Sequence, residues 1–256
     1  MRTMIDRFLE QAGKNPERTA VMDRHGAYTY GQLNRRSAIL GTHLLDMKQG
    51  DEESGKRIAV LLPRSRDFFI AVLGILRAGF AVVPLDSEYP SERIHAILND
   101  AGCFLCISAG GLSSKAADVS VLDLDEALQD EAREDADECL NLSAPDAEGL
   151  LLFTSGSTGK PKGVVHCQSI FSYGPDVLKG YHEFTERDVT CCMSGLTFVT
   201  SIIDLYAPLT AGGSVYLADE TERNYGLHRI RQNIFGLCHW EGSLPPRKAC
   251  PLYPLV

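Results

Sequence analysis

Apolar runs alternate with helical segments along the first half of the chain. Runs rich in Val, Leu and Ile predict buried strands at residues 57–63, 80–85 and 103–108. Helices are predicted between these strands, over residues 65–79 and 90–102. This strand–helix order predicts an α/β fold of mainly parallel sheets covered by helices on both faces.

A further helix is expected earlier in the chain, over residues 33–45. Thr29 and Gln32 precede it with the spacing of a capping box, in which each side chain bonds the other residue's backbone N–H. Gly79 is expected to end the helix at 65–79, because glycine readily adopts the left-handed conformation that follows many helices.

An acidic stretch separates this half from the next. Residues 123–148 are expected to form a solvated helix face or a mobile connector that bridges the first sheet to a following segment, without chemistry of its own. After it, strands are predicted at 150–153, 188–193 and 214–218, and helices at 168–180 and 200–213. No internal repeat is visible.

Length and charge narrow the class of protein. A chain of 256 residues, 44% hydrophobic and 23% charged, can bury a core as one large or two small domains. The net charge of −9 argues against nucleic-acid binding. The start of the chain lacks a signal-peptide core, and Arg77 and Pro84 break the longest apolar tract. We therefore expect a soluble, cytoplasmic protein without a membrane partner.

The cysteines and histidines do not have the spacing of a metal site. Cys103 and Cys106 form a single CxxC pair, and Cys191 adjoins Cys192, so zinc-ligand and disulfide frameworks are both disfavoured. The eight cysteines are expected to be reduced and mostly buried, and His166 to lie at a strand end. No metal ligand is predicted.

The segment LLLFTSGSTGKPKGVVH, residues 150–166, carries the clearest chemistry. It lacks the spacing of a nucleotide triphosphatase P-loop, and Pro161 has no N–H and biases Lys160 toward extended geometry. A strand, a glycine-rich loop and a second strand are predicted, with backbone N–H groups that form an anion-binding nest. The plainer alternative is a flexible surface hairpin.

Four segments together resemble one enzyme superfamily. The loop segment is similar to the signature of adenylate-forming enzymes, and YTYGQLN at 28–34 resembles their early motif. Residues 76–102 and 208–218 resemble two further motifs, and the former favours adenylation domains of nonribosomal peptide synthetases over acyl-CoA synthetases. The resemblance covers residues 1–222, which are expected to form a partial adenylation N-terminal domain.

The resemblance implies that a carboxylic or amino acid attacks the α-phosphate of ATP, with Mg²⁺ on the phosphates. The acyl-adenylate then passes to the phosphopantetheine thiol of a carrier protein. Lys162 is expected to contact phosphate. The expected β,γ-phosphate cradle consists of Thr154, Ser155, Gly156, Ser157, Thr158, Gly159 and Lys162.

The expected substrate pocket departs from the amino-acid-activating pattern. Family members of that kind usually carry Asp after the aromatic residue that opens the substrate helix, whereas here Val199 follows Phe198. Phe198, Val199 and Ile203 are expected to form an apolar wall, which favours an acid without an α-amino group. The alternative is that another residue binds the amine.

The end of the chain does not resemble the family. Its adenine and ribose motifs and its C-terminal catalytic lysine are not found after Glu220, and residues 223–256 are expected to be a truncation product or an out-of-frame extension. The isolated chain is then expected not to be a competent ligase. An acyl-CoA ligase fragment and a non-catalytic nucleotide-binding remnant remain as alternatives.

Overall fold

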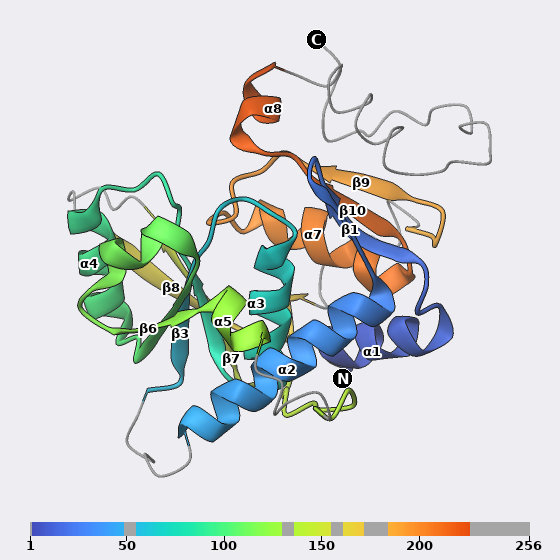
Figure 1. Ribbon diagram of the computed structural model, residues 1–256, viewed down its shortest axis with the longest axis horizontal. Coiled ribbons are helices and arrows are strands. Elements are labelled where there is room, and N and C mark those ends of the chain that lie inside the picture. Colours follow the sequence, from blue (N-terminus) through green and yellow to red (C-terminus); the bar gives the residue numbers. More distant parts are fainter. Residues whose placement is uncertain (1, 49–54, 130–135, 155–160, 172–183, 226–256) are drawn as a thin grey trace.

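The computed structural model describes residues 2–48, 55–129, 136–154, 161–171 and 184–225. Over these residues the chain forms two β-sheets with helices between and around them (Figure 1). The six-stranded sheet contains, in spatial order, β6 (Ser120–Asp123), β5 (Leu105–Ser108), β3 (Arg57–Leu61), β4 (Ala81–Pro84), β7 (Glu148–Thr154) and β8 (Lys162–Cys167). The four-stranded sheet contains β2 (Gly26–Thr29), β1 (Thr19–Asp23), β10 (Ser214–Leu217) and β9 (Val189–Cys192).

The helices lie before, between and after these strands in the sequence. They are α1 (Met4–Lys14), α2 (Tyr30–Lys48), α3 (Asp67–Arg77), α4 (Ser91–Ala101), the 3₁₀ helix η1 (Gly110–Ala116), α5 (Leu124–Leu128), α7 (Thr200–Ala211) and α8 (Glu220–Tyr225). The strands and helices predicted over residues 57–108 are therefore confirmed, with slightly shorter bounds.

Both sheets are mainly parallel, as predicted. The exceptions are the hairpins β1–β2 and β7–β8, which are antiparallel. The four-stranded sheet itself was not predicted. It forms because β1 pairs in parallel with β10, at Val21 with Val215, so that strands from the two ends of the described chain become neighbours.

The pleat of the six-stranded sheet separates its two helical layers. Ile58 and Val60 of β3 face the core that contains α2 and α3, whereas Ala59 and Leu61 face the cluster that contains α4. Because successive strand residues point to opposite faces, a continuous apolar strand suits a sheet covered on both sides. The first of these cores also includes α1, α7 and Val215 of the four-stranded sheet, so the two sheets share it.

Local sequence explains where the main helices begin and end. Thr29 N–H donates to the Gln32 side chain at 3.0 Å, and Gln32 N–H donates to Thr29 Oγ1 at 3.2 Å, which confirms the capping box before α2. Gly79 follows α3 with a φ of +81°, the left-handed conformation expected of it. Helix α1 was not predicted, although Thr3 and Asp6 form a capping box at its start.

The acidic connector runs from β6 to β7, the strand that precedes the glycine-rich loop. These two strands belong to the same sheet. Its described part also packs closely. The fully buried Arg77 donates to the backbone carbonyls of Glu138 at 2.7 Å and Leu140 at 3.0 Å. The connector therefore covers one end of α3.

Several predictions fall partly or wholly outside the described residues. The helix predicted at 168–180 is seen only at its start, residues 170–171. Of the tail at 223–256, only the last residues of α8 are described, so the domain boundary at 222 stays a prediction.

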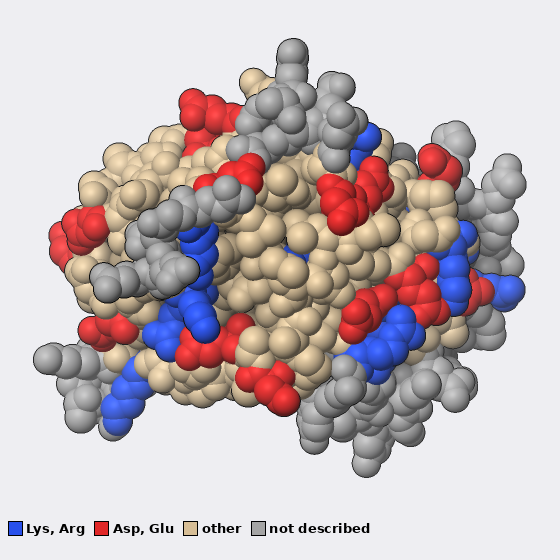
Figure 2. All heavy atoms as spheres, turned by 90° about the horizontal axis from the view of Figure 1, so that it is seen from below, with Lys and Arg blue, Asp and Glu red and all other residues tan. Residues whose placement is uncertain are grey.

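No helix among the described residues is both long and apolar enough to cross a membrane. On the face shown in Figure 2, basic side chains lie interleaved with acidic ones.

Candidate functional site

The glycine-rich loop joins two paired strands at the carboxyl end of β7. Thr154 and Lys162 are the last residue pair of the β7–β8 hairpin, and Thr154 Oγ1 donates to the Lys162 carbonyl at 3.4 Å. Both side chains are exposed. The predicted strand–loop–strand is thus confirmed on both sides of the loop. The loop residues Ser155, Gly156, Ser157, Thr158 and Gly159 lie outside the described residues.

The neighbouring strand ends place other loops near this one. Strand β4 lies between β3 and β7 and runs parallel to both, so the three strands end at the same edge of the sheet. Loops at the carboxyl ends of parallel strands commonly carry the ligand-binding residues of α/β proteins. Lys162, which starts the return strand, is therefore at an edge suited to binding.

Phe198 and Val199 precede the first turn of α7. Val199 is the residue before the helix, with helical φ and ψ of −59° and −29°, and no side chain caps the first turn. The side chains of Phe198 and Val199 are 64% and 47% exposed. Such exposure leaves both available to a ligand.

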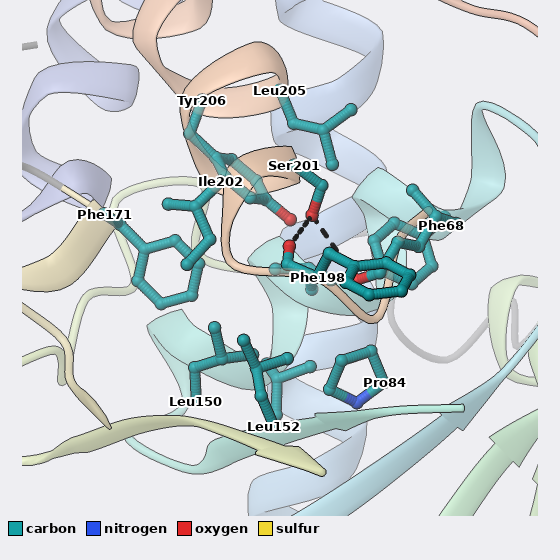
Figure 3. Close-up of a pocket in the computed structure, with 13 residues that line it drawn as sticks. Phe68, Pro84, Leu150, Leu152, Phe171, Phe198, Ser201, Ile202, Leu205 and Tyr206 are labelled. Atoms are coloured by element: carbon teal, nitrogen blue, oxygen red, sulfur yellow. Dashed lines mark hydrogen bonds between the residues drawn. The ribbon is translucent and has the colours of Figure 1, made fainter. Parts of the chain in front are cut away.

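Phe198 also borders an apolar crevice between α7 and the six-stranded sheet (Figure 3). Leu150 and Leu152 of β7 form one side, while Ile202 and Tyr206 of α7 form the other. The crevice measures about 10 Å³, barely the volume that a single water needs. Val199 is not among its lining residues, and the side chain of Ile203 lies outside the described ones. The structure therefore groups Phe198, but not Val199, with this crevice.

Two side-chain hydrogen bonds hold the start of α7 in place. Ser201 Oγ donates to the Phe198 carbonyl at 2.7 Å, and Ser194 Oγ donates to Asp204 Oδ2 at 2.8 Å. Burial raises the pKa of the Asp204 carboxyl, while the Ser194 hydroxyl and the Arg64 charge act in the opposite direction. Asp204, the nearest acid to Val199 on the helix, already has a partner.

A second crevice lies where the two sheets meet. It measures about 20 Å³, and its lining includes Arg64, Asp86, Ser87, Thr197, Glu220 and Arg223. Sequence reasoning missed both arginines. Arg64 comes shortly after the carboxyl end of β3, and that position was the one available signal.

A larger cavity lies at the opposite edge of the six-stranded sheet. It measures about 370 Å³ and is lined by side chains near the amino ends of β3, β4 and β7, including Lys48, Lys56, Phe80 and Glu148. The charges there have structural partners, because Arg57 donates to Glu148 at 2.8 and 2.9 Å and Lys48 Nζ lies 5.0 Å from the Phe80 ring centre. Size alone therefore does not identify the site.

The buried cysteines show no sign of reactivity. All six described cysteines are free thiols, as predicted, but only Cys103, Cys106 and Cys192 are buried, so the prediction that most are buried is only partly right. Burial raises the pKa of Cys103 and Cys106 to about 12, which keeps both protonated at neutral pH and unsuited to nucleophilic attack or metal binding. The described residues contain no cluster of His, Cys, Asp or Glu that could hold a metal ion.

Comparison with known proteins agrees with the geometry. A sequence model described as "AMP-binding enzyme" matches residues 8–234. Syringomycin synthase SyrB1 from Pseudomonas syringae pv. syringae is 33% identical over 208 residues, which is 81% of this chain and 33% of that protein. This chain thus spans about a third of that relative's length.

Two solved structures share the fold. The nonribosomal peptide synthetase FmoA3, in its AMPPNP-bound form, superposes with a TM-score of 0.72 and 26% identity over 84% of this chain and 22% of that one. The N-terminal subdomain of Klebsiella oxytoca NpsA, in complex with 3-hydroxyanthranilyl-AMSN, gives a TM-score of 0.75 and 23% identity over 91% of this chain and 56% of that one. The likeness to NpsA shows a shared fold.

Proposed function

Because the chain belongs to the AMP-binding enzyme family, whose members are ATP-dependent, adenylate-forming ligases, we propose that it activates a carboxylic acid as an acyl-adenylate. The observation that carries this proposal is the β7–β8 hairpin. It presents Thr154 and Lys162 at the two ends of a glycine-rich loop, at the carboxyl edge of a parallel sheet. The AMPPNP-bound state of FmoA3 supports ATP as the nucleotide.

The proposed reaction forms one bond and breaks another at the α-phosphorus. A carboxylate oxygen attacks, and the bond to the leaving pyrophosphate breaks. Negative charge grows on the leaving group, so fixed donors stabilise the transition state. Lys162 would supply a cation, and Thr154 a hydroxyl group. Further donors would come from Ser155, Gly156, Ser157, Thr158 and Gly159, which lie between them in the sequence.

Magnesium commonly accompanies ATP in such reactions. The described residues contain no group of three or more His, Cys, Asp or Glu side chains that could hold the ion by themselves. Magnesium in nucleotide sites is usually held by the substrate phosphates with one or two carboxylates, so the ion would bind here through the phosphates of ATP.

The proposed substrate class rests on Val199. This valine offers a substrate ammonium no counter-charge, and the nearest acid of α7, Asp204, lies five residues further along the chain and accepts a hydrogen bond from Ser194. An uncompensated buried charge costs several kcal/mol. We therefore propose an α-keto, α-hydroxy or aryl acid as substrate, with Phe198 and Val199 against its side chain and Ile203 as a further expected contact.

The acceptor of the acyl group is proposed to be a phosphopantetheine thiol on a carrier protein. The similarity to SyrB1 and FmoA3, which are named as peptide synthetases or synthases, supports a carrier over coenzyme A. Coenzyme A contains the same thiol arm, so the chemistry is shared and only the recognition differs.

ATP–pyrophosphate exchange tests the proposal. Residues 1–222 would be joined to the adenine-, ribose- and lysine-bearing segments of a family member, and exchange measured with and without a panel of carboxylic acids. We expect exchange that depends on the acid. Nucleotide binding without exchange for any acid would instead support a non-catalytic nucleotide-binding protein. Acyl transfer to coenzyme A but not to a carrier would correct the acceptor.

A further inference from the structure

The loop from Met193 to Val199 joins β9 to α7 and carries Phe198 and Val199, two of the proposed substrate contacts. Exposure of Phe198 and Val199 means that neither side chain anchors the loop by burial. Within the loop, the Phe198 N–H donates to the Gly195 carbonyl at 3.1 Å. This turn and the bonds from Ser201 Oγ to the Leu196 and Phe198 carbonyls fix the local shape of the loop, and Leu196 packs against the core that the two sheets share.

Arg64 connects this loop to the other sheet. It lies between β3 and α3, and its Nη2 donates to the Cys192 carbonyl at 2.6 Å, while Nη1 donates to the Ser194 carbonyl at 2.7 Å. Its Nε donates to the carbonyl of Ala218, just after β10. One planar guanidinium thus ties the ends of β9 and β10 to the end of β3, and its rigid fork fixes their relative positions.

Two further contacts hold the same stretch of backbone. Arg223 Nε donates to the Met193 carbonyl at 2.8 Å, and Ser194 Oγ donates to Asp204. Arg223 lies in α8 and Asp204 in α7, and both helices follow strands of the four-stranded sheet. These two contacts therefore hold the loop to its own side of the molecule. Among these contacts, only Arg64 reaches the loop from the six-stranded sheet, which also carries Thr154 and Lys162.

We infer that Arg64 is a positioning residue for the carboxylic-acid site: it sets the distance between the loop that opens α7 and the phosphate-binding edge of the six-stranded sheet. This inference rests on the proposed function. Arg64 acts through the backbone it holds, because Nε, Nη1 and Nη2 each donate to a main-chain carbonyl. Its role would be to place the acid, held near Phe198 and Val199, against the nucleotide held near Lys162.

Hydrogen exchange on the complete 256-residue chain tests the structural part. Arg64→Ala removes the three bonds, and we expect the amides of residues 195–202 to exchange about tenfold faster than in the unsubstituted chain. Arg64→Lys keeps the charge but lacks the rigid planar fork, and should give an intermediate rate. Arg57→Ala, at the other end of β3, is the matched control and should leave these amides unchanged.

Kinetics in the joined protein test the functional part. With phenylpyruvate as the acid, Arg64→Ala should raise the KM for the acid about tenfold while the KM for ATP stays within about twofold, and Arg64→Lys should partly restore it. A loss of stability alone would change neither KM selectively.

Two results would overturn the inference. One is unchanged exchange at residues 195–202 in Arg64→Ala, or an equal increase in Arg57→Ala. The other is an equal rise of both KM values. If the joined protein shows no acid-dependent exchange at all, the proposed function fails, while the hydrogen-exchange result still decides whether Arg64 holds the loop.

Discussion

The two edges of the six-stranded sheet differ in how their space and their polar groups are arranged. At the amino edge, a cavity of about 370 Å³ is surrounded by charges that already have partners, such as Arg57 with Glu148. At the carboxyl edge, the crevice measures only about 20 Å³, yet the exposed Lys162 and Thr154 flank a loop rich in donors. The position and availability of polar groups, rather than empty volume, distinguish the candidate site.

This difference has a physical cause. Loops after parallel strands at the carboxyl edge connect to the amino ends of helices or to further strands, so they present N–H groups to a ligand. At the amino edge the polar groups serve the fold. Arg77, which ends α3 on that side, is fully buried and bonds to carbonyls of two other segments. Substitutions at the amino edge should therefore affect stability, whereas substitutions at the carboxyl edge should affect activity.

The largest effect is expected at Arg77. Arg77→Ala should lower the free energy of unfolding by about 3–5 kcal/mol, because it removes a fully buried guanidinium and its hydrogen bonds to the carbonyls of Asn34, Glu138 and Leu140. Urea denaturation of the complete chain measures this. Burial lowers the pKa of Arg77 to about 10, so the guanidinium remains charged at neutral pH.

The matched control for that measurement is Arg36→Ala. Arg36 is exposed on α2 and lies over the Tyr28 ring at 5.0 Å, a contact worth about 0.5–1 kcal/mol. An equal loss from both substitutions would show that the buried network is not what stabilises this end of the molecule.

The next effect concerns the substrate preference at the carboxyl edge. In the joined protein, Val199→Asp should shift the ratio of phenylpyruvate to L-phenylalanine activation by about a hundredfold toward the amino acid, because a carboxylate would then pair with the ammonium. Pyrophosphate exchange with each acid measures the ratio. Val121→Asp, at an exposed valine of β6, is the control. Better activation of the amino acid with Val199 in place would contradict the proposed substrate class.

Lys162 and Lys56 compare the two edges directly. Lys162→Ala should slow pyrophosphate exchange by about tenfold or more, since a charge-assisted contact is worth roughly 1.5–3 kcal/mol. Lys56→Ala, beside the large cavity at the amino edge, should change the rate by less than about twofold. The comparison breaks down if the two variants lose activity equally.

The smallest effect is the pH dependence of the Arg57–Glu148 pair. Arg57 lowers the pKa of the Glu148 carboxyl through its hydrogen bonds and charge. A carboxylate with a lowered pKa stabilises the fold above its ordinary pKa of 4.5, and this contribution is lost as the pH falls through the lowered value. Because the pair is partly exposed, it contributes about 0.5 kcal/mol to the free energy of unfolding.

A double-mutant cycle of Arg57→Ala and Glu148→Gln measures this contribution as a coupling free energy. The coupling in urea denaturation should be present at neutral pH and vanish in acid, because protonated Glu148 no longer attracts Arg57. A coupling that persists well below the ordinary glutamate pKa would mean that the pair is not stabilised by charge.

The sequence by itself determined the elements whose cause is local. Pro161 and the β-branched residues after it prevent a helix after the glycine-rich loop, and β8 forms there as predicted. Thr29 with Gln32 and the glycine at position 79 likewise act through neighbours in the sequence. For the site, the motifs indicated the family and the residues Thr154, Lys162, Phe198 and Val199, whose roles stay predictions.

Only the tertiary structure decided the long-range arrangement. The pairing of β1 with β10 joins residues far apart in the sequence, and no local pattern specifies such a partner. The same holds for Arg64 and Arg77, whose acceptors are mainly backbone carbonyls. Every residue carries a carbonyl, so a sequence cannot show which one an arginine will reach. That choice is made when the sheets and helices pack against each other.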